Sequence, residues 1–274
     1  MEAINKLTNI SPLGIWWWNN NEVEMPPLMD FAAKHGVTEI YWSAGFGRCH
    51  WCEKTATEFL YAAHEKGIAV YYLTGDWKWV HNNDELIRRL ELFFAWQKSA
   101  CADTRFAGVH LDIEPHQDPS WKDMSARNQL LQRYIDLKVC ITDRYGRMDW
   151  DLPFWWRAEP SYWIKHRGEM KYLHEASILE ADRVFVMSYR NTAKATYEVG
   201  QHYVDFAQKV GRPIFLSAQV GSEHKKSENK HVCFYHHGHE YMMHKLKLLR
   251  EIVNYPAMGI AVHWIEEWYR MQSP

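Results

Sequence analysis

The chain has 274 residues, with 32 Lys and Arg side chains against 34 Asp and Glu. This length suits a single α/β barrel over residues 1–274, because one core of this size can be buried in one domain. The balanced charge argues against a nucleic-acid partner, and no apolar run is long enough to cross a membrane. The first residues lack a signal-peptide core, so we expect a soluble cytoplasmic protein, or a secreted one if a signal has been removed.

Cysteine and aromatic content narrow the class of protein further. Five cysteines in a long chain argue against a disulfide framework. Cys49 and Cys52 have the spacing of a metal or redox pair, but no second pair follows, and we interpret them as free thiols. The fifteen Trp and fifteen Tyr exceed what a core of this size requires. Aromatic side chains are therefore expected in a cleft, where sugar rings stack on them.

Apolar segments of strand length alternate with segments of helical period along the chain. The expected strands are residues 13–18, 37–43, 68–74, 106–114, 148–153, 183–189, 213–220 and 258–264. The expected helices are 26–35, 55–66, 84–100, 126–145, 192–210 and 237–255, with a helical segment at 160–181 broken at Gly168. The final helix is short or absent. This order predicts a (β/α)8 barrel rather than a doubly wound sheet, for which no dinucleotide-binding glycine turn is present.

The expected strand 106–114 carries polar groups on one face. His110, Asp112 and Glu114 alternate with apolar residues, and Pro115 ends the strand at its C-terminal rim, where the active sites of such barrels lie. Two close carboxylates raise one another's proton affinity. A protonated acid beside an ionised one is suited to cleavage of a glycosidic bond. We expect His110, which lies deeper, to orient Asp112.

The other strand ends add aromatic side chains and a few polar ones. In chain order they are Trp17, Trp18, Trp42, Asp76, Trp77, Asp149, Asp151, Tyr189, Arg190, Gln219, His263 and Trp264. A ring of aromatics around acids, without a basic phosphate-binding turn, predicts a neutral carbohydrate substrate. Asp76 and Asp151 are alternatively helix N-caps, and Arg190 either binds substrate or neutralises the acids.

Two motifs carry a resemblance to a known family. Gly108-x-His110-x-Asp112-x-Glu114 resembles the fourth-strand signature of the chitinase-type family-18 glycoside hydrolases, Asp-Gly-x-Asp-x-Asp-x-Glu. Met187-Ser188-Tyr189 is similar to the Met-x-Tyr of the sixth strand. The resemblance implies that Glu114 is the general acid and that Asp112 holds the substrate's 2-acetamido group, which acts as internal nucleophile. Tyr189 would hydrogen-bond the same group.

The chain also departs from that family. Ala107 and His110 stand where the family has Asp, and Arg190 stands where Asp usually follows Met-x-Tyr. Trp264 lies one residue past the expected eighth-strand Trp. The segment 110–116, HLDIEPH, is also similar to a strand of bacterial glycosidase-like barrel proteins.

The leading hypothesis is a cofactor-independent glycoside hydrolase acting on an oligo- or polysaccharide, with Glu114 as proton donor. Its second group is Asp112 or, in a conventional two-carboxylate mechanism, Asp151, Asp76 or Glu223. Gln219 weakens the conventional mechanism, because many retaining barrels carry a Glu at the end of the seventh strand.

Two other functions fit the same residues. A metal-dependent hydrolase would use His110, Asp112 and Glu114, joined by His263 or by the His-rich run 231–239. A barrel that binds carbohydrate without cleaving it is the third hypothesis. The sequence specifies neither the glycan nor the oligomeric state.

Overall fold

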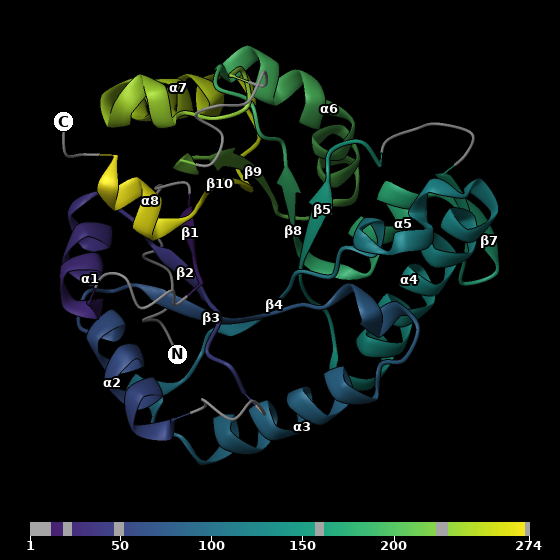
Figure 1. The fold of residues 1–274 in the computed structure, drawn as a ribbon, viewed down its shortest axis with the longest axis horizontal. Coiled ribbons are helices and arrows are strands. Elements are labelled where there is room, and N and C mark those ends of the chain that lie inside the picture. The colour runs from purple at the N-terminus through teal and green to yellow at the C-terminus, as the bar shows by residue number, and fades with distance from the viewer. Residues whose placement is uncertain (1–11, 19–23, 47–51, 157–161, 223–229, 272–274) are drawn as a thin grey trace.

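The computed structural model describes residues 12–18, 24–46, 52–156, 162–222 and 230–271. Eight parallel strands close into a barrel in the order β1-β10-β9-β8-β5-β4-β3-β2, so the predicted (β/α)8 fold is confirmed (Figure 1). The barrel strands are β1 (Leu13–Trp17), β2 (Glu39–Trp42), β3 (Ala69–Thr74), β4 (Gly108–Leu111), β5 (Met148–Pro153), β8 (Ala181–Met187), β9 (Ile214–Gln219) and β10 (Met258–His263).

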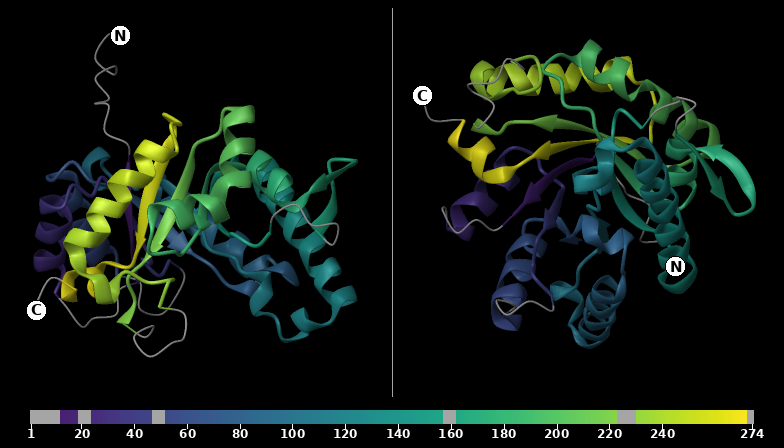
Figure 2. Two further views of the ribbon diagram at one scale, coloured as in Figure 1. Left: turned by 90° about the horizontal axis from the view of Figure 1, so that it is seen from above. Right: turned by 45° about the vertical axis from the view of Figure 1, so that its right-hand side comes forward.

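Helices surround the barrel on its outside (Figures 1 and 2). The α-helices are α1 (Met25–Lys34), α2 (Glu53–His64), α3 (Asp84–Ser99), α4 (Met124–Tyr145), α5 (Leu173–Leu179), α6 (Ala193–Val210), α7 (Gly238–Ile252) and α8 (Ile265–Arg270). Short 3-10 helices are η1 (Trp77–Val80), η2 (Ala102–Thr104), η3 (Pro115–Gln117), η4 (Pro119–Lys122) and η7 (Tyr235–His237). No helix in the described ranges is both long and apolar enough to cross a membrane.

The segment predicted as a broken helix at 160–181 is instead largely a β-hairpin. Strands β6 (Trp163–His166) and β7 (Glu169–Tyr172) pair antiparallel, and α5 follows them. Arg167 (φ 45°) and Gly168 (φ 92°) reverse the chain, and from Trp163 to His166 exposed and buried residues alternate. This period of two belongs to a strand, so the helical prediction was wrong. The hairpin projects beyond the ring of helices (Figure 2).

Alternate residues of the barrel strands face inward. The inward apolar layer consists of Trp16, Tyr41, Leu73, Phe185, Phe215 and Ala261. Residues between these positions, such as Ile15 and Ile40, belong to the larger core between the strands and the helices. The barrel interior is therefore packed, and a site can open only above the apolar layer, where the strands end.

A group of paired charges lies on the other side of the apolar layer, near the strand starts. Arg183 donates to both carboxylate oxygens of Glu39 and of Asp149, and its guanidinium carbon lies 4.3 Å from the Tyr71 ring centroid. The Tyr41 hydroxyl also donates to Glu39 at 2.9 Å. Asp149, expected at a strand end, therefore belongs to a structural ion-pair network away from the barrel mouth.

Lys138 of α4 is fully buried between the helix and β5. Its Nζ lies 4.1 Å from the Trp150 ring centroid and has no hydrogen-bond partner among the described residues. Burial lowers the pKa of this amine well below its usual range, although the charges of Glu180 and Asp151 act in the opposite direction. The folded chain therefore holds Lys138 less readily in its charged form than the unfolded chain does.

We predict that Lys138→Met raises the free energy of unfolding by about 1–3 kcal/mol, because methionine fills a similar volume without a buried, unpaired amine. Because the folded-state pKa is depressed, the wild type itself gains stability as the pH rises toward the pKa of the unfolded lysine. The gain from methionine should therefore be larger at pH 6 than at pH 9 in thermal unfolding. Lys194→Met, at a side chain 84% exposed, serves as the control. A lower free energy of unfolding in Lys138→Met, with no change in Lys194→Met, would contradict this account.

Candidate active site

Asp112 and Glu114 follow β4 directly, at the edge where the strands end. The main chain stays beside β3 as far as Asp112, whose N–H donates to the Thr74 carbonyl at 3.0 Å. A Cβ on Gly75 would lie only 1.6 Å from the Asp112 carbonyl oxygen, so only glycine permits this approach. Glu114 then precedes η3. Both predicted acids are therefore at the barrel mouth, although β4 itself ends earlier than expected.

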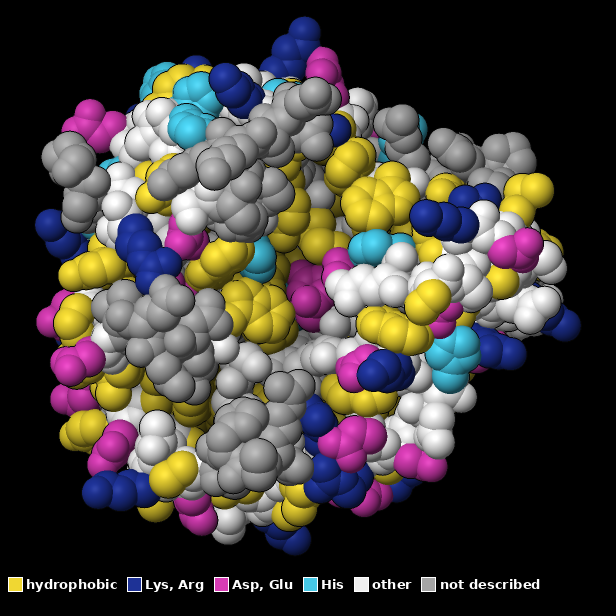
Figure 3. All heavy atoms as spheres, in the orientation of Figure 1, with side chains coloured by type: hydrophobic (Ala, Val, Ile, Leu, Met, Phe, Trp, Pro, Cys, Tyr) yellow, Lys and Arg dark blue, Asp and Glu magenta, His cyan; other side chains and the backbone are white. Residues whose placement is uncertain are grey.

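Three carboxylates interact at this mouth. They are Asp112, Glu114 and Asp151 of β5, here called the acid cluster. Burial raises the pKa of each of them, and the charges of Asp151 and Glu114 raise that of Asp112 further. The Oδ1 atoms of both aspartates are buried and have no hydrogen-bond partner within the described segments. Figure 3 shows acidic side chains at the centre of this face, beside hydrophobic ones.

Asp151 is held by two side chains from the barrel interior. His110 Nε2 lies 2.8 Å from Asp151 Oδ2, and the Trp16 side chain forms a second hydrogen bond that lowers the pKa of Asp151. Burial lowers the pKa of His110 to about 3, so the ring in this hydrogen bond is neutral. The prediction that His110 orients Asp112 or contacts substrate was wrong, because the ring is fully buried and turned to Asp151. The N-cap alternative for Asp151 is also wrong, since Asp151 lies within β5.

No Lys or Arg side chain of the described residues forms an ion pair with the acid cluster. Within 4 Å of the Glu114 carboxylate, the described residues place one basic group, His116, at 3.6 Å. Burial lowers the pKa of His116 to about 4, so it is neutral near pH 7. The Gln117 side-chain amide donates to Glu114 Oε2, which partly opposes the rise in the pKa of Glu114.

Trp17 and Trp42 do not face the mouth. Their rings pack on Phe59 of α2, with centroids 4.8 and 4.1 Å away respectively. Both are buried in the layer between strands and helices, so the prediction that they bind substrate was wrong. The inward residue of β1 is Trp16, one position before Trp17. The sequence placed Trp17 and Trp42 correctly at the ends of their strands, but it assigned them to the wrong face.

Asp76 caps the 3-10 helix η1, and Trp77 is the first residue of that helix. The Asp76 side chain accepts the Lys78 N–H at 2.9 Å, which is the N-cap alternative considered from the sequence. The Trp77 ring lies 6.1 Å from that of His81 on the same turn. Asp76 is therefore no candidate for the second carboxylate. Glu223, another candidate, lies outside the described residues.

A second wall of the mouth is centred on His263. The Trp18 indole N–H donates to His263 Nε2 at 2.9 Å, and Gln219 Nε2 lies 3.2 Å from Nδ1. The Trp264 ring lies 4.8 Å from the same imidazole and follows a cis peptide bond. The Tyr189 ring stacks at 6.0 Å and 27° on the other side. These five residues, predicted from four strand ends, lie together.

Tyr189 connects this wall to the acid cluster. Burial, together with the negative charges of Asp151, Asp112 and Glu114, raises the pKa of the phenol well above its usual range. The phenol therefore stays protonated and available as a donor across the physiological range.

A cavity of about 430 Å³ opens beside Glu114. Its other lining residues are Phe154, Trp155, Met187, Tyr189, Arg190, His231 and Val232. Sequence reasoning did not select Phe154, Trp155 or Val232. The signal for the first two was their position immediately after β5, whereas Val232 comes from a distant loop that nothing in its own sequence connects to Glu114.

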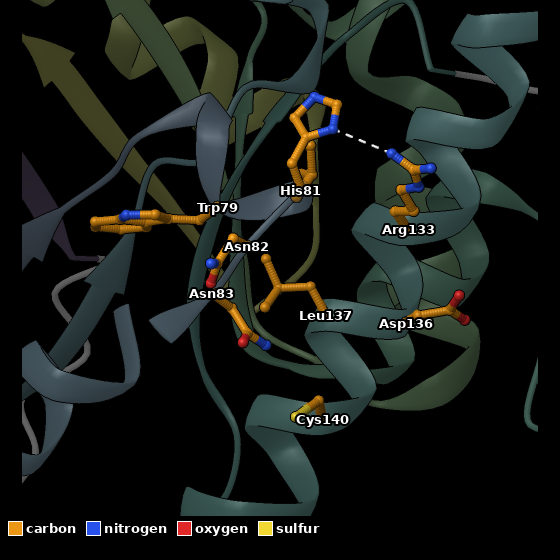
Figure 4. Close-up of a pocket in the computed structure, with 9 residues that line it drawn as sticks. Trp79, His81, Asn82, Asn83, Arg133, Asp136, Leu137 and Cys140 are labelled. Carbon is orange, nitrogen blue, oxygen red and sulfur yellow. Dashed lines mark hydrogen bonds between the residues drawn. The ribbon is translucent and has the colours of Figure 1, made fainter. Parts of the chain in front are cut away.

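A second cavity of about 420 Å³ lies on the outside of the barrel (Figure 4). It is a groove between the η1–α3 segment and α4. A hydrogen bond of 3.1 Å between Arg133 Nη1 and His81 Nδ1 crosses this groove. His81 also bonds Asp118 at 2.7 Å. No member of the acid cluster lines this groove, so the candidate chemistry belongs to the cavity at the mouth.

The metal hypothesis required His110, Asp112 and Glu114 to converge. His110 instead bonds Asp151, and no group of three or more His, Cys, Asp or Glu within the described ranges is arranged to hold a metal ion. In the His-rich run, His237 lies 3.0 Å from the Asn191 amide and stacks on Tyr241. Cys49 lies outside the described residues, and Cys52 is an exposed free thiol.

No protein-family model matches the chain, and no curated protein matches its sequence. Solved structures do match its fold. A protein assigned as an α-L-fucosidase of Bacteroides thetaiotaomicron has TM-score 0.53 and 11% identity, over 93% of this chain and 87% of its own. The spore cortex-lytic enzyme SleL of Bacillus megaterium has TM-score 0.51 and 13% identity, over 95% and 73%. The chain is therefore similar in fold to glycoside hydrolase barrels.

We predict that Asp151→Asn lowers the pKa of Asp112, because it removes the neighbouring negative charge that raises it. Carboxyl-carbon NMR titration of labelled aspartate measures this shift without requiring turnover. Asp76→Asn, which alters a cap outside the acid cluster, should leave the Asp112 titration in place. An unchanged or raised Asp112 pKa in Asp151→Asn would show that the two carboxylates do not interact.

Proposed function

We propose that the protein is a glycoside hydrolase that cleaves an oligo- or polysaccharide, with Glu114 as general acid. The observation that carries the proposal is a glutamate with raised proton affinity on the wall of an aromatic-lined cavity at the strand ends. The side chain is 18% exposed, which is enough to meet a substrate while keeping the carboxyl group largely desolvated. The fold shared with glycoside hydrolase barrels is consistent with this role.

In the proposed reaction Glu114 gives its proton to the glycosidic oxygen as the bond from that oxygen to the anomeric carbon breaks. Water then adds to the anomeric carbon and returns a proton to the Glu114 carboxylate. Trp155 offers a face on which a sugar ring stacks.

Asp112 is proposed as the neighbouring carboxylate that supports the positive charge developing at the anomeric carbon. It acts either directly or, on an amino sugar, by holding a 2-acetamido group that Tyr189 also contacts. The negative charge of Asp151 raises the pKa of Asp112, so a proton on Asp151 favours the ionised form of Asp112. In this scheme Asp151 is a positioning residue that His110 keeps in place.

We predict that Glu114→Gln lowers turnover about 10²–10⁴-fold, because glutamine keeps the shape of the side chain but has no acidic proton. A screen of amino-sugar and neutral oligosaccharides for new reducing ends identifies the substrate, and calorimetry on the variant measures its binding. Binding should persist. Glu198→Gln, on the exposed surface of α6, is the control. Full activity in Glu114→Gln would rule out the role, and binding without hydrolysis by the wild type would identify a non-catalytic barrel.

We predict that Gln117→Leu moves the alkaline limb of kcat/KM to higher pH. The Gln117 amide stabilises the Glu114 carboxylate and so lowers its pKa, and removing that donor raises the pKa of Glu114. A general acid must be protonated, so activity should persist to higher pH. Gln129→Leu, at an exposed position of α4, should leave the profile unchanged. A limb displaced to lower pH in Gln117→Leu would contradict the assignment.

A further inference from the structure

Arg190 lines the same cavity as Glu114, and two contacts hold its guanidinium there. Its guanidinium carbon lies 4.7 Å from the Phe154 ring centroid, and Nη1 donates to the Tyr189 carbonyl at 2.7 Å. Stacking on an aromatic face fixes the orientation of the planar group. A guanidinium carries five N–H donors, and this hydrogen bond uses one of them.

Arg190 has no carboxylate partner in the described part of the chain. Among the described residues, its charged group contacts the Phe154 ring and the Tyr189 carbonyl, both uncharged. Arg183, by contrast, is fully occupied by two carboxylates near the strand starts. Of the two roles that the sequence left open for Arg190, neutralising the acids is therefore the one that the geometry does not support.

A half-buried guanidinium without an ionic partner is suited to binding an anion. Part of the cavity wall around Arg190 is apolar, with Phe154, Trp155 and Val232. In such surroundings a carboxylate paired side-on with a guanidinium forms two parallel charge-assisted hydrogen bonds, which an ammonium cannot match. The cavity volume of about 430 Å³ lies in the range of small-ligand sites.

We propose that Arg190 binds a carboxylate substituent of the glycan, so that the substrate is an acidic rather than a neutral saccharide. This inference rests on the proposed function for its biological meaning and replaces the neutral substrate expected from composition. Arg190 is then a specificity residue that sets which glycan enters, while Glu114 performs proton transfer.

The test compares sugars that differ only in a carboxyl group. Binding of glucuronate against glucose, and of N-acetylmuramate against N-acetylglucosamine, is measured by calorimetry or ligand-observed NMR on the wild type. The two acidic sugars, glucuronate and N-acetylmuramate, carry their carboxylates at different positions of the ring. We expect one acidic member to bind roughly tenfold more tightly than its neutral counterpart, a typical gain from one charge-assisted pair. Equal binding within both pairs would overturn the proposal without any variant.

Variants locate the preference. Arg190→Met should abolish it, and Arg190→Lys should retain only part, since lysine keeps the charge but loses the planar fork. Arg133→Met is the matched control, because Arg133 lines the outer groove and not the cavity at the mouth. A preference for acidic sugars that survives Arg190→Met would assign it to another residue and overturn the proposal.

Repeating the binding comparison on Glu114→Gln separates this inference from the proposed function. A preference for acidic sugars, together with a wild type that hydrolyses no glycan, would support the role of Arg190 and contradict the hydrolase. Hydrolysis of neutral and acidic glycans at equal kcat/KM, with equal binding, would support the hydrolase and overturn the role of Arg190.

Discussion

Within the described residues, two groups of carboxylates lie inside the barrel, one near the strand starts and one at the mouth, and Arg183 pairs with the first of them. There, Arg183 bonds Glu39 and Asp149 and offsets part of the cost of burying them. Burial raises the proton affinity of the acid cluster at the mouth, and neighbouring negative charge within the cluster raises that of Asp112 and Asp151 further. Buried acids without a cation destabilise a fold, and for this reason we propose an active site at this strand end. The difference in pairing, more than the number of acids, distinguishes the candidate active site.

Much of the barrel could be predicted because parallel strands are buried on both faces and appear as short apolar runs between helical segments. The hairpin at β6 and β7 escaped this reasoning. Its four-residue strands are too short to separate a period of two from a helical period, and its only strong local signal is the turn at Gly168. That signal was read as a helix break. Short elements outside the repeating pattern depend on tertiary contacts that one sequence does not display.

For the site, the sequence predicted where along each strand a residue lies, but it did not predict which face of the strand its side chain occupies. Tyr189 reached the mouth as expected, whereas Trp17 faces the helices because the inward residue is Trp16. The bond between His110 and Asp151 could not be predicted from one strand, because it depends on the register of β4 against β5, which pairs His110 with Asp149 across 39 positions of sequence. Alternation identifies the face of a strand only when its phase is known, and register adds a second unknown.

The placement of Arg190 follows from the same electrostatic constraint. A cation bonded to Glu114 would stabilise its carboxylate and lower its pKa, leaving no acid to protonate a leaving group. A positive charge for recognition must therefore share the cavity without touching the acid. Phe154 and the Tyr189 carbonyl hold the guanidinium in that way, since neither is charged. In the proposed mechanism, uncharged contacts for the arginine and neutral neighbours for the acids would allow one cavity to combine anion recognition with proton donation.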